Sequence, residues 1–302
     1  MGNARTFLLN WAHARAAGGV VLYRDDDLDG PRVKTGAAAQ ARDDLLWLGL
    51  DWDVDEGVLV QSERSSTYET AAQRLLDAGL AFPCVCSRRE IERVASAPHG
   101  SDGARYPGTC DGRFASYEDA HAQTGRDAAL RFRTPPDAVT FHDLLRGPQS
   151  FNPSLETGDF PVRRANGMAA YQLATVVDDA ETGVDLVMRG DDLLPSTARQ
   201  ILLQRALGLP TPAYVHVPLV VGEDGRRLAK RHGDTRVAQL RADGVSADAL
   251  VGWLAWSAGL AGPGERLTAQ DLVGRYQLRA IPTDPVVLTD LPAPPAAPED
   301  AR

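Results

Sequence analysis

Up to Val85 the chain alternates between helical and strand patterns, and this alternation constrains the fold more than any other feature. Strands that alternate with helices pair in parallel, because each crossover helix returns the chain to the same edge of the sheet. The sequence therefore predicts an α/β fold with a doubly wound parallel sheet, with ligands at the C-terminal ends of its strands. The expected helices are Thr6–Ala17, Gly36–Leu48 and Ser66–Ala78, and the expected strands are Val20–Arg24, Val58–Val60 and Leu80–Val85.

The composition narrows the class of protein. Hydrophobic residues make up 43% and charged residues 24% of the 302 residues, which is typical of a globular protein. No apolar run is long enough for a membrane span and no basic-then-apolar leader is present, so we expect a cytoplasmic protein without a membrane partner. The net charge of -9 does not indicate a general nucleic-acid binder. Contact with a nucleic acid would need a local basic patch, such as residues 88–93 or 226–231.

Three cysteines, Cys84, Cys86 and Cys110, lie close together in the sequence. An odd, clustered number argues against a disulfide framework and favours a reducing compartment. The spacing is consistent with a structural Zn²⁺ site without an obvious fourth ligand. Three reduced, packed cysteines explain it equally well, so both interpretations stay open. The candidates for a fourth ligand are Tyr106, His99 and Asp111.

Beyond the cysteines the pattern changes twice. A helix is expected at Ser87–Ala95, opened by a capping box of Ser87 and Glu90. Short strands then indicate an inserted β-rich subdomain, after which the alternation resumes and gives way to helices and a Pro/Ala-rich tail that we expect to be disordered. The strands expected here are Ala129–Arg133, Val139–Asp143, Phe160–Arg164, Ala170–Val177, Val184–Met188 and Val215–Val221, and the helices are Ser196–Leu207, Ala247–Ala258 and Thr268–Tyr276.

Two polar segments lie at the C-terminal ends of expected strands. The acidic turn Arg24–Arg32 has three interpretations: a solvated or capping loop, a Mg²⁺ site, or a carboxylate that receives a substrate ammonium. Arg189 directly follows the strand Val184–Met188, which favours a functional role. Tyr171 by itself reads as a core aromatic with a hydrogen-bonded hydroxyl. The six histidines are scattered, and none pairs with Ser or Cys in a way that suggests a nucleophilic triad.

Two segments far apart in the sequence suit phosphate groups. The basic loop Arg227–Arg231 lies between Gly225 and Gly233, and Lys230 supplies a compact charge on a flexible stem. Gly2–Thr6 opens a helix, whose N-terminus presents free N–H groups and the positive end of a dipole to an anion. Both can serve one nucleotide only if a sheet folds between them.

Taken together, these segments resemble the motifs of a known family, the glutamyl branch of class I aminoacyl-tRNA synthetases. The resemblance covers roughly residues 1–275, and the motifs occur in the family's order. Gly2–Thr6 resembles the end of the HIGH motif, Arg24–Arg32 the Arg-x-Glu-Asp-x-Asp-x-x-Arg stretch, Val187–Leu193 the Arg-Gly-Glu-Asp segment, and Arg227–Arg231 the KMSKS loop. The set Cys84, Cys86, Tyr106 and Cys110 resembles the zinc site of the short paralogues in this branch.

The resemblance implies a ligase that activates L-glutamate with ATP and Mg²⁺ and transfers it to queuosine in the anticodon of tRNA(Asp). It also implies one structural Zn²⁺ per chain, and we expect a monomer. By resemblance, Lys230 stabilises the departing pyrophosphate and, with Gly2 and Asn3, binds ATP. Asp26 receives the α-ammonium of glutamate. Tyr171 and Arg189 hold the amino acid, Arg189 through its side-chain carboxylate.

The same resemblance suggests how the chain divides. We expect the first half of a nucleotide-binding α/β domain (1–82), an inserted zinc-binding and β-rich subdomain (83–165), the second half with the KMSKS-like loop (166–234), a helical region (235–290) and a disordered tail (291–302).

Two departures from the family pattern matter. Asp26 stands where the family has Glu, one methylene longer. The chain also begins inside the HIGH motif, so we expect a native start about twenty to thirty residues upstream, and little adenylate formation if the chain begins at Met1. Two other functions stay open: a truncated glutamyl-tRNA synthetase that charges a 3′ end, and an inactive paralogue that only binds its ligands.

Overall fold

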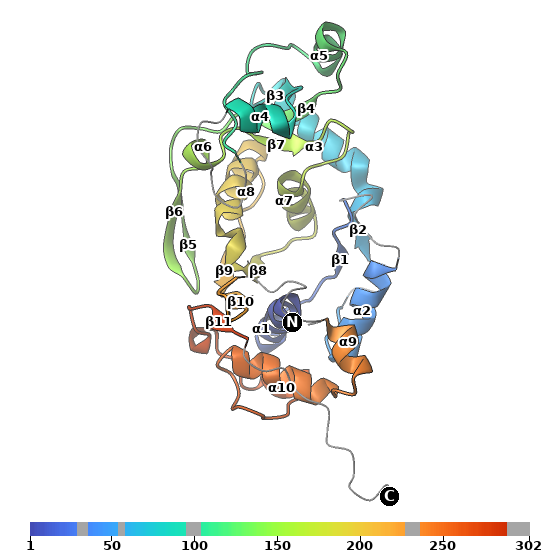
Figure 1. The fold of residues 1–302 in the computed structure, drawn as a ribbon, viewed down its shortest axis with the longest axis vertical. Coiled ribbons are helices and arrows are strands. Elements are labelled where there is room, and N and C mark those ends of the chain that lie inside the picture. Colours follow the sequence, from blue (N-terminus) through green and yellow to red (C-terminus); the bar gives the residue numbers. More distant parts are fainter. Residues whose placement is uncertain (29–35, 54–57, 95–103, 227–235, 289–302) are drawn as a thin grey trace, which may run out of the picture.

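The central sheet has four strands in the order β6-β5-β9-β8. The computed structural model of the chain describes residues 1–28, 36–53, 58–94, 104–226 and 236–288 (Figure 1). β8 and β9 pair in parallel across helix α8, β5 joins β9 in parallel, and β5 and β6 form an antiparallel hairpin. This is the crossover that the alternation predicts. The elements are β5 (Val139–Asp143), β6 (Gly147–Phe151), β8 (Leu186–Gly190), α8 (Leu194–Leu207) and β9 (Ala213–Val217).

A second parallel pair, β1 with β2, forms a two-stranded sheet separate from the central one. The expected strand Val20–Arg24 is wrong for most of its length, because only its last residue enters a strand. Val20 and Leu22 are exposed and Val21 alone packs against a core, so burial holds only one residue of this apolar run in place. The elements are β1 (Arg24–Asp25), α2 (Ala37–Trp47), β2 (Leu59–Val60), the 3₁₀-helix η2 (Gln61–Arg64) and α3 (Ser65–Asp77).

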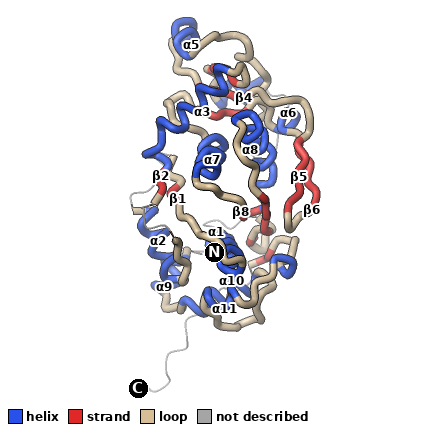
Figure 2. Tube along the Cα trace, turned by 180° about the vertical axis from the view of Figure 1, so that it is seen from behind, coloured by secondary structure: helices blue, strands red, loops and turns tan. Residues whose placement is uncertain are grey.

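The expected strand Ala170–Val177 is wrong: this segment forms helix α7 (Tyr171–Glu181). A short apolar run suits a buried helix as well as a buried strand, and its packing partners select between them. Leu173, Ala174 and Val177 fall on one helical face and pack in a core with residues of α3 and α8. Figure 2 shows α7 between these two helices.

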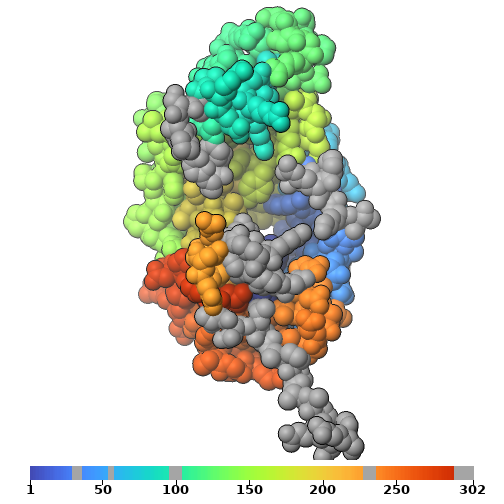
Figure 3. Space-filling model, viewed as in Figure 1, coloured from blue at the N-terminus to red at the C-terminus, as the bar shows by residue number. Residues whose placement is uncertain are grey.

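A small antiparallel sheet, β3-β4-β7, lies at the end of the molecule opposite helix α10 (Figure 1). In the space-filling view this end is coloured teal to green, and the opposite end carries the orange and red of the C-terminal residues (Figure 3). The capping box predicted at Ser87 is confirmed, since the Ser87 N–H donates to Glu90 and the Glu90 N–H donates to Ser87 Oγ. The elements here are β3 (Ala81–Cys84), α4 (Arg88–Val94), α5 (Tyr117–Thr124), β4 (Ala129–Phe132), α6 (Pro153–Glu156) and β7 (Phe160–Arg163).

Helix α1 (Gly2–Ala16) packs against β8 and the C-terminal helices. Leu8 and Trp11 are buried there, whereas Phe7 is exposed. Trp253 and Trp256 are partly buried, and Trp253 packs against the core. The remaining elements are β10 (Val220–Val221), α9 (Val237–Ala242), α10 (Ala247–Ser257), α11 (Ala269–Val273), the 3₁₀-helices η3 (Asp191–Leu193) and η5 (Leu278–Ala280), and β11 (Val286–Val287), which pairs with β10.

Among the described residues, no helix combines the length and the apolar character that crossing a bilayer requires. The domain boundaries remain a prediction. β5 precedes the boundary after residue 165 and β9 follows it, yet both belong to the central sheet. The tail 291–302 lies outside the described residues.

Candidate active site

Arg189 lies near the end of β8, where its guanidinium is buried among neutral partners. Its Nε donates to His216 Nε2 at 3.1 Å, and its Nη2 donates to Thr197 Oγ1 at 2.7 Å. The face of the group lies 5.7 Å from the centre of the Tyr214 ring. Only 8% of the residue is exposed. A buried cation without a directly bonded carboxylate is costly unless an anion binds to it, so this geometry favours an anionic ligand.

Tyr171 is the first residue of α7 and lies beside Arg189. Its hydroxyl is 3.5 Å from Arg189 Nη1, and 37% of the residue is exposed. The interpretation as a core aromatic is therefore wrong. Tyr171 and Arg189, eighteen positions apart in the sequence, come together at a surface that solvent reaches.

His216 on β9 connects Arg189 to a buried carboxylate. Its Nδ1 is 2.7 Å from Asp143 Oδ2, and neither His216 nor Asp143 is exposed. Burial lowers the pKa of His216, which the Asp143 hydrogen bond only partly opposes. Burial alone would raise the pKa of Asp143, but hydrogen bonds from His216 and from two backbone N–H groups outweigh it and lower that pKa.

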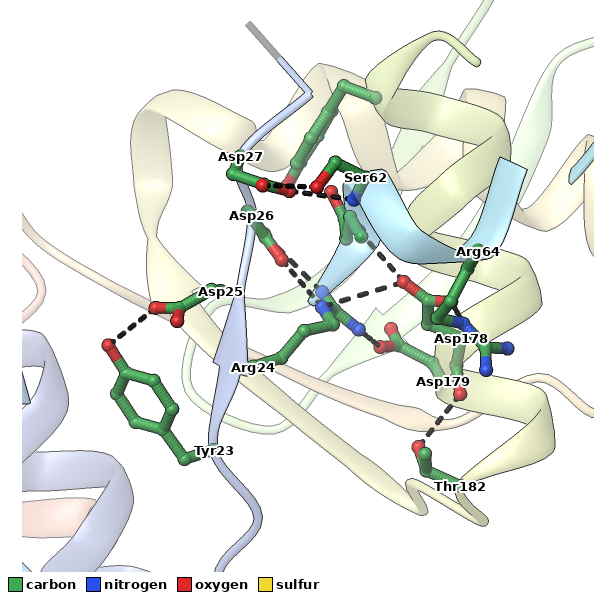
Figure 4. Close-up of polar contacts among 12 residues, drawn as sticks. Tyr23, Arg24, Asp25, Asp26, Asp27, Ser62, Arg64, Asp178, Asp179 and Thr182 are labelled. Atoms are coloured by element: carbon green, nitrogen blue, oxygen red, sulfur yellow. Dashed lines mark hydrogen bonds and ion pairs between the residues drawn. The ribbon is translucent and has the colours of Figure 1, made fainter. Parts of the chain in front are cut away.

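Asp26, the predicted ammonium ligand, is bonded to Arg24 of β1 (Figure 4). Arg24 Nε donates to Asp26 Oδ1 at 2.6 Å, and its Nη1 donates to Asp179 of α7 at 2.6 Å. Burial alone would lower the pKa of Arg24, but the carboxylates of Asp26 and Asp179 outweigh it and raise that pKa. The Asp26 side chain is 44% exposed, so it still faces solvent.

Every other carboxylate of the described part of the acidic turn also has a donor. Asp27 accepts from the Ser62 N–H and hydroxyl, and Asp25 accepts from Arg42 and Tyr23. Within the described ranges, the one cluster of potential metal ligands found among His, Cys, Asp and Glu is made of cysteines. The turn therefore joins neighbouring elements, and the Mg²⁺ interpretation gains no support from the described carboxylates.

A buried network behind Arg24 fixes the position of α7. Asp178 is fully buried and accepts from Arg64 Nε at 2.9 Å, the Tyr68 hydroxyl at 2.9 Å and Gln61 Nε2 at 2.8 Å. Arg24 Nε lies 3.8 Å from the same carboxylate. These contacts tie β1, η2 and α3 to the helix that carries Tyr171.

The start of α1 meets the segment that follows β9. Gly2 opens the helix, Asn3 is exposed in its first turn, and no side chain caps it. Arg5 is buried and donates to the carbonyl of Pro218 at 2.6 Å, across 213 positions of sequence; burial lowers its pKa to about 10. Lys230 and the rest of the basic loop lie outside the described residues.

The three cysteine thiols form one cluster. Their sulfur atoms lie within 4.8 Å of one another, with Cys86 and Cys110 at 3.4 Å, and all three are free. The Tyr106 hydroxyl lies 3.4 Å from Cys84 Sγ and accepts from the Cys110 N–H at 2.8 Å. Tetrahedral Zn–S bonds of about 2.3 Å would put sulfur atoms about 3.8 Å apart, so this donor set fits a zinc ion.

The candidates for a fourth ligand differ in position. Tyr106 is buried beside Cys84, whereas the Asp111 carboxylate is bonded to Arg133. His99 lies outside the described residues. Arg131 also reaches this cluster, with Nε 3.2 Å from Cys84 Sγ and its guanidinium 4.0 Å from the centre of the Tyr106 ring.

Sequence reasoning missed Asp143, His216 and Arg24 as contributors to the site. The available signal was a polar residue in or ending a short apolar strand, as with His216 between Val215 and Val217. Such a pattern does not identify the residue to which the polar side chain is hydrogen-bonded. His216 and Asp143 are 73 positions apart, and only the pairing of β5 with β9 brings them together.

The sequence of the whole chain was compared with protein families and with known proteins. The sequence matches the family described as tRNA synthetases class I (E and Q), catalytic domain, over residues 1–266. It is 48% identical over 294 residues to a glutamyl-Q tRNA(Asp) synthetase from Symbiobacterium thermophilum, covering 95% of this chain and 91% of that protein. A protein of the same name from Rhodopirellula baltica is 43% identical over 311 residues, covering 96% and 93%.

A solved structure shows the same fold. The crystal structure of a glutamate tRNA ligase from Elizabethkingia meningosepticum, in complex with its amino acid, superposes with a TM-score of 0.80 at 21% sequence identity. The match covers 95% of this chain and 64% of that one. The predicted α/β class I synthetase fold is thereby confirmed.

Proposed function

The chain belongs to the class I tRNA synthetase family for glutamate and glutamine, and we propose that it activates L-glutamate with ATP and transfers the glutamyl group to queuosine in the anticodon of tRNA(Asp). It is thus a ligase. Relatives named for this modification match nearly the whole chain. The observation that carries the substrate assignment is Arg189, a buried cation whose bonded partners are neutral.

Glutamate would bind with its side-chain carboxylate on Arg189. Two parallel N–H donors of a guanidinium match the two oxygens of a carboxylate. The Tyr171 hydroxyl lies beside Nη1 and would donate to the same substrate. Because Arg189 bonds to no carboxylate within the described ranges, we propose that the substrate supplies the negative charge.

Asp26 would receive the α-ammonium of glutamate. Its Oδ1 is held by Arg24 at 2.6 Å, whereas Oδ2 is 3.5 Å from the nearest Arg24 nitrogen. Oδ2 is therefore the oxygen that a substrate ammonium would use. Arg24 also places a positive charge directly beside this carboxylate, at 2.6 Å from Oδ1.

Activation joins a carboxylate oxygen to phosphorus. The α-carboxylate of glutamate attacks the α-phosphate of ATP, the bond to the bridging oxygen of the β-phosphate breaks, and pyrophosphate leaves. The attacking group is already ionised, so the step needs alignment and charge neutralisation rather than a general base. Gly2 and Asn3 at the start of α1 would face the nucleotide. Lys230 and the Mg²⁺ that accompanies ATP would neutralise the pyrophosphate.

The cysteine cluster would hold one structural Zn²⁺ through Cys84, Cys86, Tyr106 and Cys110. Bound there, the ion would tie the end of β3 to the loop that carries Tyr106 and Cys110. Elemental analysis of the purified chain should give one zinc per chain, and Cys110→Ser should lose it and lower the unfolding temperature. A metal-free chain whose unfolding temperature does not respond to added Zn²⁺ would contradict this assignment.

Transfer would follow by attack of a queuosine hydroxyl on the activated carbonyl, with release of AMP. We propose that the protein works as a monomer in the cytoplasm, where thiols such as these remain reduced. Light scattering on the free chain checks the monomer.

Two assays test the function. Glutamate-dependent exchange between ATP and pyrophosphate tests activation. Glutamate transfer to tRNA(Asp) before and after periodate treatment tests the acceptor, because periodate cleaves the cyclopentene diol of queuosine. Charging of a 3′ end is separated by blocking that end enzymatically rather than with periodate. Labelling of tRNA(Asp) made without queuosine, abolished when its 3′ end is blocked, would overturn the proposal in favour of a glutamate–tRNA ligase. Periodate-treated tRNA cannot give this result, because periodate also cleaves the diol of the 3′-terminal ribose. Binding of ATP and tRNA without exchange would favour an inactive paralogue.

A further inference from the structure

We propose that His216 and Asp143 are positioning residues for Arg189, which fix one edge of its guanidinium so that the opposite end faces the side-chain carboxylate of the substrate. This inference rests on the proposed role of Arg189 in glutamate binding. It concerns two fully buried residues that do not touch the substrate themselves.

A guanidinium has two usable forks of N–H donors. One is the edge formed by Nε and Nη2, and the other is the end formed by Nη1 and Nη2. In this protein His216 and Thr197 occupy the first fork, and they also contact each other at 3.1 Å. The second fork lies toward the hydroxyl of Tyr171, a residue that is 37% exposed. The protein thus holds Arg189 by the edge that the substrate does not need.

The protonation of His216 follows from its partners. Arg189 Nε can only donate a proton, so His216 Nε2 must accept it and must carry no proton of its own. The proton of neutral imidazole therefore resides on Nδ1, where it is donated to Asp143. The lowered pKa of His216 agrees with a neutral ring. A proton on Nε2 would place two donors against each other and displace Arg189.

Asp143 is itself held on both oxygens. Oδ1 accepts from the N–H groups of Leu145 and Arg146 in the tight turn between β5 and β6, and Oδ2 binds His216. Arg146 also holds the backbone of His216, since its Nε donates to the His216 carbonyl at 3.3 Å. Its Nη2 pairs with Asp191. The hairpin β5–β6 therefore sets the position of the His216 ring through a carboxylate that has no freedom to rotate.

The arrangement separates the negative charge of Asp143 from Arg189 by a neutral ring. A carboxylate bonded directly to Arg189 would neutralise it and compete with the substrate. The imidazole gives Arg189 an acceptor without giving it a counter-ion. The charged groups around His216 are Arg189, Asp143, Asp191 and Arg146.

The Asp143–His216–Thr197 contacts do not form a nucleophilic triad. Thr197 and His216 are completely buried, and the Nε2 lone pair that a general base would need is already bonded to Arg189. A group that can neither meet a substrate nor accept its proton cannot activate a hydroxyl. Positioning is the role that remains.

The first test uses the ligand-free chain and does not depend on activity. Nitrogen-15 NMR of His216 should show the neutral Nδ1–H tautomer between pH 6 and 8. Asp143→Asn should abolish that single state and weaken the protection of the Arg189 Nε–H from exchange with solvent. A protonated ring, or the Nε2–H tautomer in the unaltered chain, would overturn the inference.

The second test separates the two hydrogen bonds of the His216 ring, the one that Nδ1 donates and the one that Nε2 accepts. Asn places an amide near the position of Nδ1, so His216→Asn keeps a donor for Asp143 and loses the acceptor for Arg189. Gln reaches the position of Nε2, so His216→Gln keeps that acceptor. We expect His216→Asn to raise the KM for glutamate in the exchange assay about tenfold or more, with the KM for ATP nearly unchanged. His216→Gln should raise the KM for glutamate less.

His142→Asn is the matched control, because His142 is the exposed neighbour of Asp143 on the same strand. It should leave the KM for glutamate unchanged. Equal effects of the Asn and Gln variants, or effects confined to kcat and unfolding temperature, would show that His216 only supports the fold. If the unaltered chain lacks glutamate-dependent exchange, the proposed function fails, and the NMR experiment still decides the positioning of Arg189.

Discussion

Two arginines near the candidate site are held in opposite ways. Arg24 lies among carboxylates: Asp26 and Asp179 at 2.6 Å and Asp178 at 3.8 Å. Arg189 is more deeply buried, yet its hydrogen bonds are to an imidazole, a threonine hydroxyl and a tyrosine hydroxyl. Arg24 is therefore bonded to carboxylates of the protein, whereas Arg189 has no bonded carboxylate among the described residues and interacts with Asp179 only through space.

This difference indicates what each arginine does. A cation among fixed carboxylates joins structural elements, and breaking such a buried pair costs stability. A cation with neutral partners contributes little to folding, because its desolvation is not repaid until an anion binds. The nature of the hydrogen-bond acceptors thus separates a structural arginine from a ligand-binding one, although both lie at the ends of strands.

The largest expected effect is on substrate binding. Arg189→Ala should raise the KM for glutamate about 100-fold or more, since losing one partner of a buried charge pair costs roughly 3 kcal/mol, while the unfolding temperature stays unchanged or rises. Exchange kinetics and thermal unfolding of the same preparation measure both. A marked loss of stability with normal glutamate binding would reverse the roles assigned to the two arginines.

The next effect concerns stability. Asp178→Asn should lower the free energy of unfolding by about 3 kcal/mol, because it removes the buried charge that pairs with Arg64 and leaves Arg64 only its exposed partner Glu181. Denaturant unfolding measures this. Asp248→Asn, which breaks the exposed pair with Arg266, is the control and should cost less than about 1 kcal/mol. Similar losses of unfolding free energy in both variants would show that the buried network stabilises the fold no more than an exposed ion pair does.

The smallest effect is a dependence of stability on pH. The folded pKa of His216 lies below its unfolded value of 6.5, so the unfolded chain binds more protons below that pH and stability falls as the pH falls. The slope is at most about 1.4 kcal/mol per pH unit for each such histidine. His216→Gln should reduce the slope between pH 6.5 and 5 without abolishing it, because burial lowers the pKa of His13 as well. An unchanged slope would mean that His216 is not buried in its neutral form.

The sequence by itself determined the α/β class, most helix positions and the types of residue at the strand ends. Helical periodicity and caps are local properties, which is why α2, α3, α8 and α10 lie close to their expected bounds. The cysteine cluster was also foreseeable, because its members lie within one short excursion of the chain.

Only the tertiary structure decided how the arginines are held. Asp143 meets His216 across 73 positions, and Arg24 meets Asp179 across 155. The same level of structure turned Ala170–Val177 from an expected strand into the helix that brings Tyr171 to Arg189. The physical reason is that side-chain pattern is set by neighbours in sequence, whereas the acceptor that a buried charge receives is set by which strands pair and which helices pack together.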